Sequence, residues 1–102
     1  MSLDFTAIKD HPGSAIFFLH NGTETGIQHF ADLMADVSRK TKKQTLLLDA
    51  TQNPGRSIVD FYKLKGSQFV IIVRDDDQLH HVWSDGERFD ASHIAFTAEQ
   101  AG

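Results

Sequence analysis

The chain has 102 residues, with 14 acidic and ten basic side chains, a formal net charge of −4 at pH 7, and no cysteine. This length fits one small domain over residues 1–102, in which folding buries roughly 60–70% of the surface of the unfolded chain. The lack of cysteine excludes disulfides, thiolate metal sites and thiol catalysis. The acidic balance argues against a nucleic-acid binder, which normally carries a basic patch.

No apolar run reaches the roughly 18 residues of a membrane span, and no basic start followed by an apolar stretch indicates a signal peptide. We therefore expect a cytoplasmic protein without a membrane partner. The one basic cluster, residues 39–43, follows a predicted helix, where cations interact favourably with the helix dipole.

Four elements are predicted in the first half of the chain. The spacing of Phe5 and Ile8 predicts a short helix over residues 4–9, which the following Pro and Gly end. The wholly apolar run at 15–19 predicts a strand covered on both faces, and residues 45–49, with three consecutive leucines, show a second buried-strand pattern. Between them, apolar residues spaced by three and four predict a helix over 26–40. Its apolar stripe comprises Ile27, Phe30, Ala31, Met34 and Val37.

Two residue pairs compete for the start of that helix. Thr25 and Gln28 match a capping box, in which the Thr oxygen accepts from an amide and the Gln reaches back. Asn21 and Glu24 offer the same pattern one turn earlier.

The second half predicts a short helix after residues 53–55, strands at 69–73 and 79–83, and a last helix. The polar turn at Asp75–Asp77 makes the two strands antiparallel partners. The later strand should lie at the edge of the sheet, with Leu79, His81 and Trp83 on one face. Trp83 either faces the core, which is the favoured prediction, or anchors a partner at an exposed surface. The last helix covers 91–99, starts at Asp90, and packs inward through Ile94, Ala95 and Ala98.

The first two strands and the helix between them form a βαβ unit, which implies parallel strands and a right-handed crossover. Residues 46–55 (LLLDATQNPG), 62–66 (YKLKG) and 69–73 (FVIIV) resemble, in order and spacing, segments of the thioredoxin family. The resemblance covers about residues 14–98. It implies an α/β thioredoxin-like fold, a four-stranded mixed sheet with helices on both faces.

The same resemblance implies which reaction is missing. The turn over residues 20–26 occupies the place of the family's redox cysteines, and the place of its cis-proline falls at Gln68. The first core strand, 15–19, also lacks the family's buried acid. Disulfide oxidoreductase activity is therefore excluded. We expect a trans peptide bond before Gln68, because a cis bond before a non-proline residue costs about 2.5–4 kcal/mol.

The leading hypothesis is a redox-inactive, thioredoxin-like binding module: an adaptor, chaperone-like or regulatory domain whose partner is another protein or a peptide. The contact surface expected from the family lies on the turn at 20–26, the segment around Gly66 and the loop at 84–86. Its candidate residues are His20, Asn21, Gly22, Thr23, Glu24, Thr25, Ser67 and Gln68. No cofactor is expected, and a homodimer would form through an edge strand or a helix face.

Two alternatives place other chemistry at the same turn. Thr23 or Thr25 would act as a nucleophile if His20 served as its base and Glu24 oriented that base. Free amides at the helix start would hold an anion or a small ligand, although Glu24 would repel an anion. No metal is expected, because adjacent His80 and His81 point to opposite faces of a strand and the other histidines lack zinc-site spacing.

Overall fold

Residues 3–102, which are the residues that the computed structural model describes, fold into a mixed succession of strands and helices. A short 3₁₀ helix η1 (Phe5–Ala7) precedes strand β1 (Ala15–His20), helix α1 (Glu24–Ser38) and strand β2 (Gln44–Asp49). Helix α2 (Gly55–Phe61), strands β3 (Phe69–Val73) and β4 (Leu79–Ser84), and helix α3 (Ala91–Glu99) follow. The predicted α/β order is confirmed. The N-terminal helix is shorter than the predicted 4–9.

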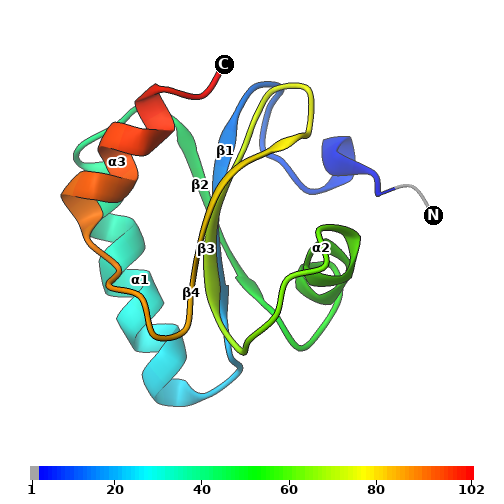
Figure 1. Cartoon of the computed structure of the whole chain (residues 1–102), viewed down its shortest axis with the longest axis vertical. Helices are drawn as coiled ribbons and strands as arrows, with labels where there is room; N and C mark the ends of the chain where they lie inside the picture. The colour runs from blue at the N-terminus through cyan, green and yellow to red at the C-terminus, as the bar shows by residue number, and fades with distance from the viewer. Residues whose placement is uncertain (1–2) are drawn as a thin grey trace.

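The strands form one mixed sheet with the order β2-β1-β3-β4. β1 runs parallel to β2, with Phe17 opposite Leu46, and antiparallel to β3, with Phe17 opposite Ile71. β3 and β4 are antiparallel. Helices α1 and α3 cover one face of the sheet, and α2 and η1 lie on the other (Figure 1). The prediction of four strands in a mixed sheet with helices on both faces is therefore confirmed.

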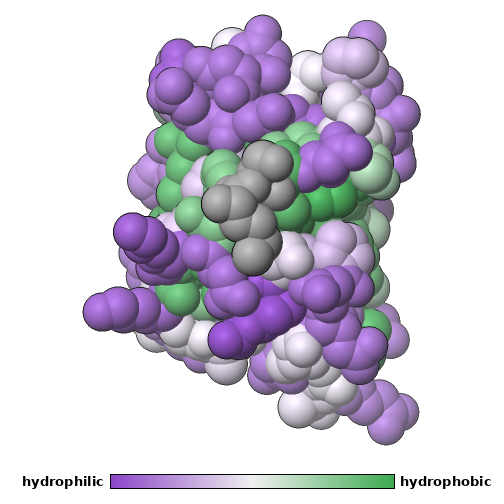
Figure 2. All heavy atoms as spheres, turned by 90° about the vertical axis from the view of Figure 1, so that its right-hand side faces the viewer, coloured by the Kyte–Doolittle hydropathy of each residue, from purple (hydrophilic) through white to green (hydrophobic). Residues whose placement is uncertain are grey.

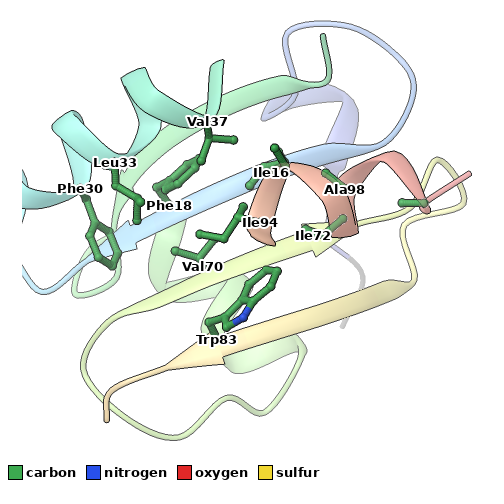
Figure 3. Close-up of a cluster of buried hydrophobic side chains, with 12 residues drawn as sticks. Ile16, Phe18, Phe30, Leu33, Val37, Val70, Ile72, Trp83, Ile94 and Ala98 are labelled. Carbon is green, nitrogen blue, oxygen red and sulfur yellow. The ribbon is translucent and has the colours of Figure 1, made fainter. Parts of the chain in front are cut away.

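Each face of the sheet carries its own apolar core. On the α1 and α3 side, Phe18 of β1 and Val70 of β3 point toward Phe30 of α1, Ile94 of α3 and the indole of Trp83 (Figure 3). Trp83 is 4% exposed, as predicted for a core residue. The α2 side buries Phe5, Phe17 and Ile58 but leaves several apolar side chains partly at the surface (Figure 2).

Helix α1 differs from its prediction in both bounds and face. It begins at Glu24 rather than 26 and ends at Ser38 rather than 40. Its buried residues are Gly26, Phe30, Leu33 and Val37, whereas the predicted Ile27 is 40% exposed. Both stripes have helical spacing and share Phe30 and Val37. Because α1 packs against α3 as well as against the sheet, the side of the helix that carries Leu33 is buried and the side that carries Ile27 is exposed. The spacing of apolar residues does not distinguish these two sides.

Two strands also depart from the predicted faces. A β-bulge in β4 places Ile72 opposite His81 and Val73 opposite Leu79, so His80 is the extra residue. Leu79 therefore packs on the α2 side, opposite to Trp83, which corrects the prediction that they share a face. β2 was predicted to be a buried strand, but it lies at a sheet edge and all its residues after Gln44 are only half-buried.

Asp77 ties together three segments at the end of the sheet where β1 begins. Its carboxylate accepts from Lys9 Nζ at 2.9 Å, and its backbone carbonyl accepts from Tyr62 Oη at 2.6 Å. Burial, followed by the charges of Asp77 and Asp76, raises the pKa of Tyr62 above its usual range. Asp77 thus anchors the segments that follow η1 and α2 to the β3–β4 turn.

Candidate functional site

The eight predicted site residues lie at one end of the sheet, at the lower end of Figure 1. The strand register explains their proximity: His20 is opposite Asp49, and Phe69 lies between Leu19 and Ser84. The loop after β1, the approach to β3 and the loop after β4 therefore meet at this end. We call residues 20–26, 66–68 and 84–86 the loop-end surface.

Thr23 caps helix α1, not Thr25. The Thr23 hydroxyl accepts from the Gly26 amide at 3.0 Å, and it donates to Asn21 Oδ1 at 2.6 Å. The same oxygen of Asn21 accepts from the Thr23 amide at 3.1 Å. A β-carbon on Gly26 would lie 2.2 Å from that oxygen, so glycine lets the turn fold against the helix. The capping box predicted from Thr25 and Gln28 is wrong.

The cap assignment predicts a difference between two threonine variants. Thr23→Ala should lower the free energy of unfolding by about 0.5–2 kcal/mol, because it removes the side-chain acceptor of the first helical turn. Thr25→Ala should change it by less than about 0.5 kcal/mol, since Thr25 is exposed inside the helix. Urea unfolding of both variants measures the difference, and a larger loss for Thr25→Ala would contradict the assignment.

His20 is 8% exposed at the end of β1 and shapes the turn that follows. Its Nδ1 accepts from the Gly22 amide at 3.0 Å, so in the neutral ring the proton sits on Nε2. Gly22 has a φ of +83°, in the left-handed region that glycine adopts without a steric cost. The histidine therefore has a structural role in holding the turn against the strand end.

Asp49 belongs to this site and was missed from the sequence. Its Oδ1 accepts from the Thr51 amide at 2.8 Å and from the Thr51 hydroxyl at 2.6 Å. These bonds lower the pKa of Asp49, and the charge of His20 acts in the same direction. A β-carbon on Gly22 would lie 3.5 Å from its carboxylate, so the two loops are close. The Asp-x-Thr spacing at a strand end was the available signal, because it is typical of an Asx turn.

Ser67 and Gln68 are held by Asp85 of the β4–α3 loop. The Asp85 carboxylate accepts from the Gln68 amide at 2.8 Å, from the Ser67 amide at 3.2 Å, and from the Ser67 hydroxyl. The peptide bond before Gln68 is trans, as predicted. The hydrogen bond from the Ser67 hydroxyl lowers the pKa of Asp85, with smaller contributions from the Gln68 and Ser67 amides. The amides of this segment are therefore occupied from within the chain.

The depressed pKa of Asp85 makes a pH-dependent prediction. Its contribution to stability is present above the unfolded pKa of about 3.9 and is lost as the pH falls through the lower folded pKa. Asp85→Asn should therefore be less stable than the wild type at pH 6, and the difference should shrink toward pH 2. Urea unfolding of both proteins across this range tests the effect, and a pH-independent difference would show that the charge is irrelevant.

The nucleophile arrangement predicted as an alternative is not assembled. Among residues 3–102, the His20 ring receives one hydrogen bond, from Gly22, and the Thr23 hydroxyl pairs with Asn21 and Gly26. The hollow beside this turn is open to solvent, and its lining includes Glu24 and Thr25 but not His20. An anion at the helix start would meet the carboxylates of Glu24 and Asp49, which repel it.

Within residues 3–102, no group of three or more His, Asp or Glu side chains is placed to hold a metal ion. In the same range, no helix is both long and apolar enough to cross a membrane. Comparison of the sequence with protein-family models and with curated proteins found no significant match.

Proposed function

We propose that this chain is a redox-inactive domain of the thioredoxin-like fold that binds another protein or a peptide through the loop-end surface. The element order and the mixed sheet order β2-β1-β3-β4 support the fold assignment. The chain contains no cysteine, so binding replaces thiol chemistry at this surface.

One observation carries the proposal: three loops far apart in the sequence meet at one end of the sheet and are braced there by their own side chains. Asn21 and Thr23 fix the first loop, and Asp85 fixes the second and third to one another. A braced surface loses little conformational entropy on binding, which favours affinity. Glu24, Thr25 and Ser67 are exposed on it and available for contact.

A matched pair of charge reversals on helix α1 tests the proposal. Peptides selected from a random display library on the wild type should bind Glu24→Arg at least tenfold more weakly, because Glu24 lies in the loop-end surface. Asp36→Arg makes the same charge change at the other end of the same helix and should leave the affinity unchanged. Fluorescence polarisation measures each affinity, and melting temperatures confirm that both variants are folded.

A second substitution, on a different loop, tests whether the peptides contact the whole loop-end surface and not Glu24 alone. Gln68→Arg should weaken the same peptides. Equal losses for Glu24→Arg and Asp36→Arg, or unchanged affinity for Glu24→Arg and Gln68→Arg, would overturn the proposal.

A further inference from the structure

The two edges of the sheet differ in their protection against strand pairing. β4, the edge expected from the sequence, contains a β-bulge, a device that disrupts the regular ladder. β2 is the opposite edge, pairs with β1 without a register shift over six residues, and contains neither proline nor lysine. Its three consecutive leucines, Leu46–Leu48, are all half-buried. β2 is therefore an unprotected, apolar edge.

The backbone groups that β2 leaves unpaired can be identified. The Ala50 amide donates to the His20 carbonyl at 2.8 Å, so residue 50 faces β1. The N–H and C=O groups of alternate residues point to the same side of a regular strand, so Leu46 and Leu48 also face β1. Thr45 and Leu47 therefore turn their N–H and C=O groups outward, where the sheet has no further strand.

We propose that β2 pairs with β2 of a second copy of this chain in antiparallel orientation, with Leu46 of each copy on the two-fold axis. This register sets Thr45 opposite Leu47 of the other copy, and the outward N–H and C=O groups of these two residues bond to one another. The two-fold axis repeats this hydrogen-bonded pair, with Leu47 opposite Thr45 of the other copy. It joins two four-stranded sheets into one continuous sheet through a symmetric, self-complementary contact.

The charges at the two ends of β2 favour a second copy of this chain as the partner of this edge, and they favour this register. Lys43, directly before β2, falls opposite Asp49 of the other copy, and the two-fold axis repeats this pair of opposite charges. Opposite charges directly across antiparallel strands are stabilising, and like charges are destabilising. Lys43 Nζ donates to the Ala101 carbonyl at 3.2 Å, and an ammonium group has two further N–H donors for a carboxylate.

Two single-cysteine variants test the register in a chain that has no other thiol. In the proposed dimer, Leu46 lies directly opposite Leu46 of the other copy in a non-hydrogen-bonded pair, and the two Cα atoms are about 4.5 Å apart. This distance allows a disulfide. Leu48 lies opposite residue 44 of the other copy instead. Leu48 of the other copy is four residues further along that strand, roughly 13 Å away. Both leucines are partly buried on the α2 side, so the substitutions are matched.

Leu46→Cys should form a covalent dimer on mild oxidation and Leu48→Cys should remain monomeric on a non-reducing gel. In parallel, light scattering of the unmodified chain should show the mass rising toward twice the monomer mass with concentration. Lys43→Glu should weaken this self-association at least tenfold, and Lys42→Glu should not. A mass independent of concentration, or cross-linking of Leu48→Cys as fast as that of Leu46→Cys, would overturn the proposal.

Discussion

Phe30→Ala should lower the free energy of unfolding by about 3–5 kcal/mol, the usual cost of truncating a buried phenylalanine. The Phe30 side chain is fully buried between α1 and the sheet. Its ring meets Phe89 at 5.2 Å and Phe18 at 6.4 Å, both in edge-to-face geometry. Such aromatic pairs add about 0.5–1.5 kcal/mol beyond burial, which places the expected loss toward the upper end of the range.

This loss is large beside the whole stability of a domain of this size, roughly 5–15 kcal/mol. Urea unfolding followed by the fluorescence of Trp83, the one tryptophan of the chain, measures it from inside the same core. Phe96→Ala on α3 is the matched control, because Phe96 is 66% exposed and its truncation should cost less than about 0.5 kcal/mol. Equal losses for the two variants would refute the assigned core.

Local sequence patterns predicted the elements of this fold because burial dictates them. The runs at 15–19 and 69–73 are apolar at every position and short, which favours strands covered on both faces, and both are fully buried strands. Asp90 was predicted as the start of the last helix, and its side chain accepts from the Ser92 amide. The elements therefore follow from short-range spacing, and βαβ geometry fixes the parallel pair β1 and β2.

Errors arose where a contact that the sequence pattern itself does not contain decides between two local solutions. Thr23 and Thr25 both have capping chemistry, and the contact of Asn21 with Thr23 and Gly26 selects Thr23. The bulge at His80 depends on the pairing of β4 with β3, so alternation along β4 alone placed Leu79 on the wrong face. A single strand does not encode the register of its partner.

In the candidate site, too, some features followed from the sequence and others did not. The resemblance to thioredoxin predicted that loops 20–26, 66–68 and 84–86 belong to one surface, and the strand register brings them to one end of the sheet. It gave no sign that Asp85 bonds to the amides of Ser67 and Gln68. The two segments lie 17 residues apart, so no short motif contains both the donors and their acceptor.

Gly55→Ala should destabilise the protein by about 1–3 kcal/mol, although alanine favours helices over glycine by up to about 1 kcal/mol. Gly55 is the first residue of α2 and is buried against the end of β2. A β-carbon there would lie 2.0 Å from the Asp49 carbonyl oxygen. That oxygen belongs to the backbone of a paired strand and cannot rotate away, so the cost of overpacking exceeds the gain in helix propensity.

The same clash should reach the loop-end surface, because Asp49 also bonds to Thr51 and lies beside Gly22. In Gly55→Ala, the NMR amide resonances of Thr51 and Gly22 should therefore shift, and the urea midpoint should fall. Arg56→Ala is the neighbouring control: it removes only an exposed ion pair with Asp60, at 3.4 Å, worth about 0.3–0.5 kcal/mol. An unchanged midpoint for Gly55→Ala would mean that α2 moves away from β2 without cost, and that the close packing at Asp49 does not position the site.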